Sequence, residues 1–354
     1  MPFRLPAVFI SFSLALFALP AFAEDAWETI TPGGETSCAL GTPYSFHARH
    51  ADPEKLVVFF NGGGACWAGQ TCDPAVEPTT YYVPSAQMGH NDPRNHRGIF
   101  DLDNPANPVG EWSMIFVSYC TGDVHLGETD KTYEKPDGHE ITIRHRGHVN
   151  AHAALAWMKE NIGNAKQVLV AGSSAGAIAA PVYAGVVSKI YPDASVQQLG
   201  DGAGGYSSPE IGGLLANWGV TDILPSWLPL EADTVTDFNA LYEGAATAFP
   251  EISFAQYDAA HDRVQIGFQQ ALQGGTALHE QIVANRAALS EAIPGFASFM
   301  AGGAEHTILR APYLYSYSAN GISFVDWLGA LVTGEAPETV DCAGSTDGCD
   351  NAPS

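Results

Sequence analysis

The sequence predicts an α/β fold in which helices cover both faces of a mostly parallel sheet. Three continuous apolar runs support this prediction: residues 55–61 (KLVVFFN), 112–119 (WSMIFVSY) and 168–171 (VLVA). Runs of this length are typical of strands that are buried on both faces. Segments with apolar residues at helical spacing separate and follow the runs. Such alternation favours parallel strands that are joined by helices.

The first 23 residues are expected to be a signal peptide and not part of the fold. Arg4 supplies a positive charge, residues 8–19 form an apolar core, and residues 21–23 (AFA) form a small-residue cleavage site near Ala23. No segment is long and apolar enough to suggest a membrane span. We therefore expect a secreted or periplasmic monomer in which residues 24–354 form one domain.

The first half of this domain is predicted to contain two strands and one helix. The strands are residues 55–61 and 112–119, and the Pro-, Asn- and Asp-rich residues 71–107 between them indicate loops. Residues 146–161 have apolar side chains at helical spacing, so they predict a helix.

The second half repeats the pattern of strand and helix around one insertion. Residues 201–250 are rich in Gly, Pro and Trp and are expected to form a cap over the sheet. The remaining predicted strands are residues 168–171, 196–199, 252–256 and 296–301. One predicted helix follows the strand at 168–171 and ends near residue 190, and three more span residues 261–272, 277–292 and 324–332.

The charge of the chain excludes some classes of partner. The sequence has 15 Lys and Arg against 39 Asp and Glu, for a net charge of −24, and loss of Arg4 with the leader makes it more negative. Such a surface repels nucleic acid and anionic membranes, so we expect neither as a partner. It also argues mildly against a strongly polyanionic polymer as substrate.

All six cysteines follow the expected cleavage site, and their even number predicts disulfides. Short spacing pairs Cys66 with Cys72 and Cys342 with Cys349, which leaves Cys38 for Cys120. Zinc is the alternative for the short-spaced pairs, but their spacings fit no common zinc motif.

Residues 172–176 (GSSAG) form a G-x-S-x-G motif between a predicted strand and a predicted helix. In that setting Ser174 occupies a sharp turn that exposes its hydroxyl, and flanking glycines let strand and helix approach closely. We therefore interpret Ser174 as a nucleophile. The alternative is a tight turn in which Ser173 or Ser174 caps the helix.

A serine nucleophile needs a base, and the base needs an acid to orient it. His306 follows the strand predicted at 296–301 and is the favoured base, ahead of His261 and His279. Asp258 and Asp262 both follow the strand at 252–256, and their positions leave the choice of acid open. The other aspartate is expected to cap the next helix.

Two further patterns bear on the site. Residues 61–65 (NGGGA) end a strand, and with the N–H group of Ala175 they suit an oxyanion hole better than a phosphate loop, because no G-x-x-x-x-G-K-[ST] motif is present. His148 and His152 have the i, i+4 spacing of a metal pair but no evident third ligand, so no metal is expected.

Several motifs in order resemble the pectin acetylesterase family, which includes the Notum carboxylesterases. The resemblance covers roughly residues 57–309. Its motifs are residues 61–67 (NGGGACW) with Cys72, 119–127 (YCTGDVHLG), 171–176 (AGSSAG), 201–204 (DGAG), 262–265 (DRVQ) and 305–306 (EH).

The resemblance implies an α/β-hydrolase fold, ester hydrolysis through an acyl-serine, and no cofactor. It matches Ser174 to the nucleophile and His306 to the base. It favours Asp262 over Asp258 as the acid, because the family's acid lies three positions before a glutamine. The other matches are Gly63, Gly64 and Ala175 to the oxyanion hole, Trp67 to the pocket wall, and Cys66 with Cys72 to the family's C-x₅-C loop.

The sequence departs from the family at two places: Ala65 separates the glycines from Cys66, and residues 307–310 (TILR) replace a longer cysteine-bearing segment. We expect a polysaccharide acetyl ester such as acetylated pectin as substrate. The alternatives are a short-chain or lipid ester, an amide, or a non-catalytic carbohydrate-binding protein. Trp218 and Trp227 in the expected cap either stack on sugar rings or fill core.

Overall fold

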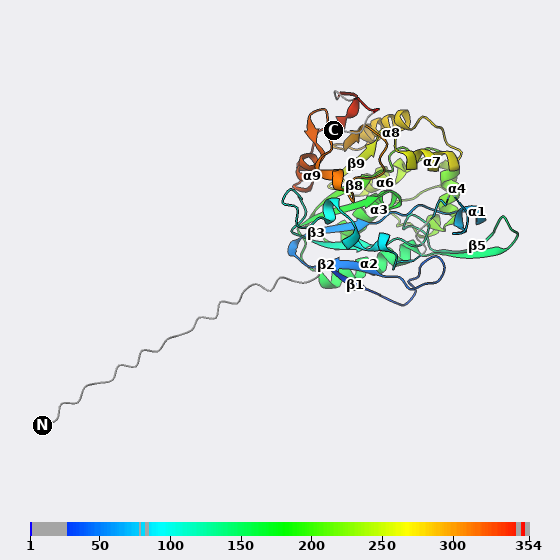
Figure 1. The fold of residues 1–354 in the computed structure, drawn as a ribbon, viewed down its shortest axis with the longest axis horizontal. Helices are drawn as coiled ribbons and strands as arrows, with labels where there is room; N and C mark the ends of the chain where they lie inside the picture. Colours follow the sequence, from blue (N-terminus) through cyan, green and yellow to red (C-terminus); the bar gives the residue numbers. More distant parts are fainter. Residues whose placement is uncertain (2–26, 78, 82–84, 345–347, 351–354) are drawn as a thin grey trace.

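The computed structural model describes Met1 and residues 27–77, 79–81, 85–344 and 348–350. The expected signal peptide and its cleavage site therefore lie outside the described residues. Within them, one large sheet runs through the molecule and helices pack on both of its faces (Figure 1). The predicted α/β architecture is confirmed.

The central sheet is parallel except at one end. Its order is β1 (Trp27–Ile30), β2 (Phe46–Arg49), β4 (Trp112–Val117), β3 (Asp52–Phe60), β7 (Gln167–Ser173), β8 (Ser195–Asp201), β9 (Ser253–Ala259), β10 (Ala297–Ala301) and β13 (Val340–Asp341). Only the β1–β2 and β2–β4 pairs are antiparallel among these described strands. The carboxyl ends of β3, β7, β8, β9 and β10 therefore meet at one edge of the sheet.

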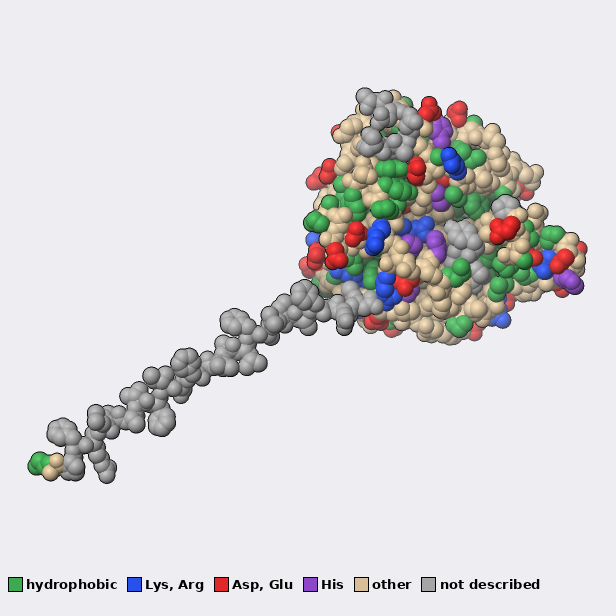
Figure 2. All heavy atoms as spheres, viewed as in Figure 1, with side chains coloured by type: hydrophobic (Ala, Val, Ile, Leu, Met, Phe, Trp, Pro, Cys, Tyr) green, Lys and Arg blue, Asp and Glu red, His purple; other side chains and the backbone are tan. Residues whose placement is uncertain are grey.

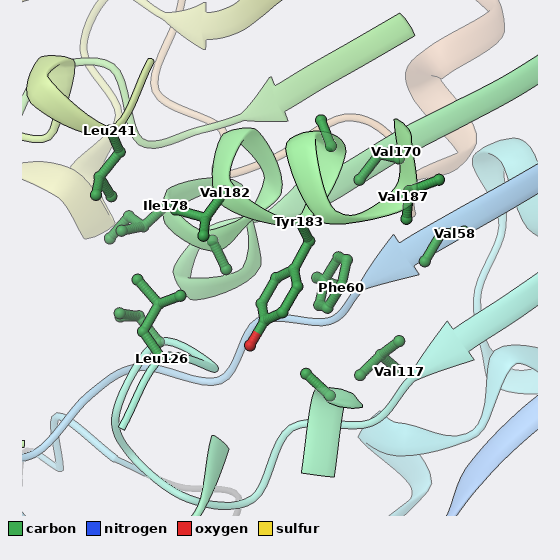
Figure 3. Close-up of a cluster of buried hydrophobic side chains, with 14 of the residues drawn as sticks. Val58, Phe60, Val117, Leu126, Val170, Ile178, Val182, Tyr183, Val187 and Leu241 are labelled. Carbon is green, nitrogen blue, oxygen red and sulfur yellow. The ribbon is translucent and has the colours of Figure 1, made fainter. Parts of the chain in front are cut away.

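Successive side chains of the buried strands point to opposite faces of the sheet and pack in two separate hydrophobic cores. On one face Val58 and Phe60 of β3 pack against α2 (Gly147–Asn161) and α3 (Ala175–Ile190). The rings of Phe60 and Tyr183 stack with their centroids 4.5 Å apart (Figure 3). On the other face Val57 and Phe59 pack toward α9 (Phe324–Val332). This two-sided burial is why these strands read as continuous apolar runs.

Two pairs of strands were not anticipated from the sequence. The short antiparallel strands β1 and β2 extend the sheet past β4. The hairpin of β5 (Thr129–Glu134) and β6 (Glu140–His145) projects from the body of the molecule (Figure 1). Its strands are largely exposed, so they carry little of the apolar pattern that reveals a buried strand.

Residues 201–250, predicted as a cap, contain three α-helices: α4 (Glu210–Asn217), α5 (Val220–Ile223) and α6 (Asn239–Ala248). Helix α6 packs against α3 and so belongs to the layer that covers the sheet. Helix α7 (Arg263–Ala271) follows β9, and α8 (Leu278–Ala292) precedes β10.

The remaining elements are short. They are the helix α1 (Gly69–Cys72), the strands β11 (Ser318–Ala319) and β12 (Ile322–Ser323), and the 3₁₀ turns η1 (Gly89–Asn91), η2 (Pro93–Asn95), η3 (Gly98–Phe100), η4 (Ala232–Thr234), η5 (Pro312–Tyr315) and η6 (Cys342–Gly344). The described part of residues 71–107 is thus mainly loop, as predicted.

The structure contains the three predicted disulfides, Cys38–Cys120, Cys66–Cys72 and Cys342–Cys349. Among the described residues, no helix has the length and apolar character that a membrane span requires. On the face drawn in Figure 2, acidic side chains are scattered, and histidine and basic side chains lie both near the centre and toward the rim. On this face the negative charge is therefore not gathered into a single patch.

Candidate active site

Ser174 lies at a strained turn between β7 and α3. Its φ of 56° and ψ of −120° lie outside the regions that L-residues favour. A Cβ on Gly172 would lie 2.2 Å from the oxygen of Gly176, and one on Gly176 would lie 2.0 Å from the oxygen of Phe60. Glycine is thus required on both sides, so the small-residue pattern around Ser174 has a direct structural cause.

The glycine loop after β3 packs directly against this turn. A Cβ on Gly62 would lie 2.9 Å from Cβ of Ser174. Gly64 adopts a φ of 81° and approaches Thr80 so closely that a Cβ would lie 1.9 Å from its carbonyl oxygen. Only glycine is compatible with both features. The two predicted oxyanion elements, the glycine loop and the start of α3, therefore meet beside Ser174.

Two buried or half-buried histidines fix the peptide groups of the glycine loop. His125 Nε2 donates to the oxygen of Asn61 at 2.7 Å, and His90 Nε2 donates to the oxygen of Gly62 at 3.0 Å. Desolvation by burial lowers the pKa of His125 to about 4 and that of His90 to about 3, so both rings are neutral near pH 7. Since C=O and N–H of one peptide point in opposite directions, the N–H of Gly63 is directed away from His90.

His306 and Asp262 form a close pair near the same edge of the sheet. His306 follows β10, and its Nδ1 lies 2.7 Å from Asp262 Oδ2. Asp262 is fully buried, whereas the His306 side chain is 16% exposed. Because a carboxylate only accepts hydrogen bonds, Nδ1 carries the proton and Nε2 is left as an acceptor. Among the described residues, no partner contacts Nε2.

Asp262 has all of its acceptor positions occupied. Oδ1 accepts from the backbone N–H groups of Val264 and Gln265, and Oδ2 accepts from the Gln265 side chain as well as from His306. Asp262 is thus also the N-cap of α7. The expectation that a different aspartate would cap this helix is wrong, because Asp258 lies inside β9 and accepts from Gly204 N and the Gln265 side chain rather than from the first backbone N–H groups of the helix.

A third carboxylate joins the serine turn to the histidine loop. Asp201 ends β8 and is fully buried. It accepts from Ser173 Oγ at 2.6 Å and from the backbone N–H groups of Ile308 and Leu309 at 2.9 Å and 3.0 Å. Desolvation by burial raises its pKa, while these hydrogen bonds oppose the rise. Asp201 therefore ties the residue before Ser174 to the segment after His306.

Ser174 and His306 both lie against the Asp201–Gly202 segment. Ser174 N donates to the oxygen of Asp201 at 2.8 Å, and a Cβ on Gly202 would lie 3.4 Å from Cε1 of His306. The structure thus brings Ser174, His306 and Asp262 to one edge of the sheet. Among the described residues no hydrogen bond joins Ser174 to His306, which is common in sites that hold no substrate.

A narrow apolar pocket opens beside Ser174, with a cavity volume of about 30 Å³. Trp67 lies in its wall together with Ala175, as the resemblance implied. Trp218 also lines it but is fully buried, and its Nε1 donates to the oxygen of Cys66 at 2.8 Å. Trp227 packs edge-on against Phe249. Both cap tryptophans therefore serve mainly as core.

The other candidate histidines lie elsewhere. His261 Nε2 lies 3.2 Å from Asp350 Oδ1, and its ring is 5.6 Å from that of His279. His148 and His152 stack on α2 at 4.2 Å, and burial lowers the pKa of His148 to about 4.

Within the described residues, the one group of three metal-ligating side chains that lie close together is His279, Cys342 and Cys349. The sulfurs of Cys342 and Cys349 are bonded to each other, so they are not free to act as thiolate ligands.

Sequence reasoning missed three residues that support the site: Asp201, His90 and Gln265. Asp201 stands in a motif (DGAG) that the resemblance already singled out, so a role at a strand end was within reach. His90 lies in a long loop without periodicity. The side-chain contacts of Gln265 depend on how β9 and α7 pack, which no local pattern reveals.

Comparison with known proteins agrees with the geometry. The family model described as Pectinacetylesterase matches residues 31–208, which include Ser174 and the glycine loop but neither Asp262 nor His306.

Three curated proteins show similarity at modest identity. The palmitoleoyl-protein carboxylesterase notum1a of Danio rerio is 25% identical over 144 residues, which are 40% of this chain and 27% of that protein. The palmitoleoyl-protein carboxylesterase notum2 of Xenopus laevis is 28% identical over 40% of this chain and 28% of its own length. The inactive palmitoleoyl-protein carboxylesterase notum1b of Danio rerio is 29% identical over 31% of this chain and 78% of its own length.

The matched stretch thus spans less than a third of the length of two of these relatives. The family model, in contrast, covers half of this chain and includes the serine turn. The chain belongs to the pectinacetylesterase family.

Proposed function

We propose that this chain is a serine carboxylic ester hydrolase that works through an acyl-serine intermediate and removes short acyl groups, acetyl above all, from a polysaccharide such as pectin. The observation that carries the proposal is the meeting of a strained Ser174 with the His306–Asp262 pair at one edge of the sheet. This is the arrangement that hydrolysis by a nucleophilic serine requires.

In the first half of the proposed reaction, Ser174 Oγ bonds to the ester carbonyl carbon while its proton passes to Nε2 of His306. The tetrahedral intermediate then expels the alkoxy oxygen, which takes the proton from His306 and leaves as the alcohol. Asp262 holds the ring through Nδ1 and stabilises the imidazolium. In the second half the oxygen of a water molecule bonds to the acyl carbon while one of its protons passes to Nε2 of His306. The bond between the acyl carbon and Ser174 Oγ then breaks, Oγ takes that proton back from His306, and the acid leaves.

The oxyanion is proposed to bind at the N–H groups of Ala175 and the glycine loop. Ala175 is the first residue of α3, so its N–H has no acceptor within the helix and lies at the positive end of the helix dipole. The N–H of Gly63 makes no hydrogen bond within the described part of the chain. The N–H of Gly64 is the further candidate. Loss of one such donor typically costs about 10²- to 10³-fold in turnover.

The size of the pocket supports a short acyl group. Its volume of about 30 Å³ is room for roughly two water molecules. A long apolar chain, which the names of the Notum relatives suggest for those proteins, would have to extend beyond this pocket. The space that adjoins it across Trp67 and Leu214 is larger, about 350 Å³, and is lined in part by Glu210 and Asn217. Polar groups of this kind suit sugar hydroxyls better than hydrocarbon.

One of the relatives is named inactive, so sequence similarity alone does not support catalytic activity. A non-catalytic carbohydrate-binding protein on the same fold would need neither the strained serine nor the His306–Asp262 pair. Backbone strain and a buried carboxylate both cost stability, and their presence together favours catalysis.

The test is hydrolysis of p-nitrophenyl acetate, butyrate and octanoate, together with acetate release from acetylated pectin and acetylated xylan. Ser174→Ala serves as the control. We expect the rate to fall as the acyl chain lengthens, and we expect acetate from at least one polymer, with both activities lost in the variant.

The other outcomes each contradict a specific part. Preference for octanoate without release from polymers would replace the acetyl assignment with a lipid carboxylesterase. Activity that survives in Ser174→Ala would contradict the nucleophile. No hydrolysis of any ester by the folded wild-type protein would favour the binding-protein alternative.

A further inference from the structure

Asp258, which the sequence leaves as the second candidate acid, is buried only a few residues from Asp262. It is 1% exposed and lies inside β9. The Gln265 side chain bridges the two carboxyl groups, since its Nε2 donates to Asp258 Oδ1 at 2.9 Å and to Asp262 Oδ2 at 3.2 Å. Gln265 Oε1 accepts from the N–H of Gly205 at 3.0 Å, which fixes the orientation of the amide.

The hydrogen bonds of Asp258 are strongly unequal. Oδ1 accepts from Gly204 N at 2.9 Å and from Gln265 Nε2, whereas Oδ2 is buried without a partner among the described residues. An ionised carboxylate shares its charge between both oxygens, so an unsatisfied one is costly. A neutral carboxylic acid instead has one carbonyl oxygen that accepts and one hydroxyl that donates.

An acceptor for such a hydroxyl lies nearby. Gln256 and Asp258 are two residues apart on β9, so their side chains lie on the same face of the sheet. Gln256 Oε1 is also buried and unpartnered among the described residues. A Cβ on Gly204 would lie 2.2 Å from Asp258 Oδ2 and 3.1 Å from Gln256 Oε1, so both oxygens face the space that Gly204 leaves open.

We propose that Asp258 is a protonated carboxylic acid that donates to Gln256, and that it holds Gln265 as the positioning residue of Asp262. Gln265 then steadies the same Asp262 oxygen that contacts His306. The proposal rests on the proposed function, in which Asp262 orients the base. Of the two carboxyl groups bridged by this amide, Asp258 is thus the neutral support, and Asp262 is the group that accepts from the base.

The electrostatic surroundings of Asp258 agree with this assignment. Desolvation by burial raises its pKa to about 7, and the charge of Asp262 adds to the rise, while the hydrogen bonds from Gly204 and Gln265 and the charge of Arg286 oppose it. The other titratable groups that interact with Asp258 are three tyrosine hydroxyls, all of them neutral near pH 7: Tyr206, Tyr242 and Tyr257.

The decisive variants are Asp258→Asn and Asp258→Ala, tested by steady-state hydrolysis of p-nitrophenyl acetate. Asparagine reproduces the neutral acid, with Oδ1 as acceptor and Nδ2 as donor to Gln256. We therefore expect Asp258→Ala to lower kcat by about 10²-fold, as misplacement of catalytic groups does, and Asp258→Asn to restore kcat to within about threefold of wild type.

Gln265→Met tests the bridge, and Gln269→Met is its matched control. Gln269 lies one turn later on α7, is 2% exposed, and binds backbone groups of Ser207 in the same manner, but makes no hydrogen bond with either aspartate. Gln265→Met is expected to lower kcat by about 10²-fold with little change in KM. Gln269→Met is expected to lower the melting temperature similarly while kcat stays within about threefold of wild type.

The melting temperature of Asp258→Asn against wild type, at pH 5 and pH 8, adds a readout that does not depend on catalysis. A carboxyl with a raised pKa in the folded state binds more protons than in the unfolded chain, so its stabilisation is lost as pH rises toward 7. We expect the melting temperature of Asp258→Asn to rise relative to that of wild type from pH 5 to pH 8. An equal difference at both values would show an ionised Asp258 and overturn the proposal.

If Asp258→Asn lowered kcat as much as Asp258→Ala does, that result would also overturn the proposal. Asp262→Asn separates this failure from failure of the proposed function, because loss of the acid costs about 10⁴-fold in serine hydrolases. If Asp262→Asn is inactive and Asp258→Asn has as little activity as Asp258→Ala, Asp262 remains the acid of the proposed function, and the proposal of a protonated Asp258 is wrong. If Asp262→Asn stays active and Asp258→Asn is dead, Asp258 is the acid and both proposals fail.

Discussion

At the scale of single residues, the site depends on which of two adjacent serines reacts. Ser174 occupies the strained turn, and its N–H is held by the oxygen of Asp201. Ser173 is fully buried, and its hydroxyl donates to the Asp201 carboxylate at 2.6 Å. The two serines thus have separate tasks: Ser174 presents a hydroxyl to the pocket, and Ser173 fixes the strand end beneath it.

We predict that Ser174→Ala lowers kcat for ester hydrolysis by about 10⁶-fold, because the nucleophile is removed. Ser173→Ala is expected to keep activity within about tenfold of wild type. It should lower the free energy of unfolding by roughly 1–3 kcal/mol, since the buried Asp201 carboxylate loses a hydrogen bond. Kinetics and denaturant unfolding of both variants measure these effects. If Ser173→Ala were inactive and Ser174→Ala active, Ser173 rather than Ser174 would be the nucleophile.

At the scale of elements, the site is assembled from the carboxyl ends of neighbouring strands. β3 supplies the glycine loop, β7 the serine turn, β8 Asp201, β9 leads to Asp262, and β10 leads to His306. Asp201 joins these strand ends, because its carboxylate contacts the last residue of β7 and the segment that follows β10. Parallel pairing brings these ends to one edge, so residues distant in sequence meet without long loops.

We predict that Asp201→Asn weakens both the fold and the reaction. In either orientation of the asparagine amide, its nitrogen faces a backbone N–H donor, that of Ile308 or that of Leu309, from which the carboxylate oxygen accepts. The expected loss is roughly 1–3 kcal/mol in the free energy of unfolding, with a lower kcat as the segment after His306 loosens. Denaturant unfolding and p-nitrophenyl acetate kinetics test this. Wild-type stability in the variant would show that Asp201 does not brace the site.

The elements that sequence reasoning predicted are those with a strong buried pattern. β3, β4, β7 and α3 lie within a few residues of their predicted bounds because the apolar segments that predict them are almost wholly buried. β1, β2 and the β5–β6 hairpin were missed, since short or exposed strands carry little apolar pattern. The pairing of His306 with Asp262 was anticipated through the resemblance, whereas residue patterns alone left Asp258 equally open.

At the scale of the whole molecule, the Cys38–Cys120 disulfide links the amino-terminal segment to the end of β4 across 82 residues. Chain-entropy arguments give about 4 kcal/mol for a loop of this length. We predict that the double variant Cys38→Ser with Cys120→Ser loses up to that amount of stability. Its expected p-nitrophenyl acetate kcat at a temperature where it stays folded is close to wild type. Unchanged unfolding in denaturant would contradict the role assigned to this link.

The buried ionisable groups set the pH dependence of stability. Burial lowers the pKa values of several histidines, which are therefore neutral in the folded state but charged in the unfolded chain below about pH 6.5. Three buried aspartates act in the opposite direction, because burial raises the pKa of Asp123 to about 6, that of Asp258 to about 7, and that of Asp201. The histidines are His90 with a pKa of about 3, and His96, His125, His145 and His148 with pKa values of about 4.

Since these five histidines outnumber the three aspartates, the unfolded chain binds more protons between pH 4 and about pH 6.5, and the free energy of unfolding rises with pH across that range. We predict that the melting temperature increases from pH 4.5 to pH 6.5 and changes little above it. Thermal unfolding followed by circular dichroism at several pH values tests this. A melting temperature that is highest near pH 4.5 and falls as the pH rises would contradict the prediction and show that the aspartates outweigh the histidines.

The most direct test of the central claim is covalent labelling of the wild-type protein with an organophosphate ester, followed by peptide mass mapping. The phosphoryl group should form one bond to Ser174 Oγ, with loss of ester hydrolysis in proportion to labelling and no label in Ser174→Ala. A label on another residue, or full activity in a protein labelled at Ser174, would contradict a reaction that proceeds through this serine.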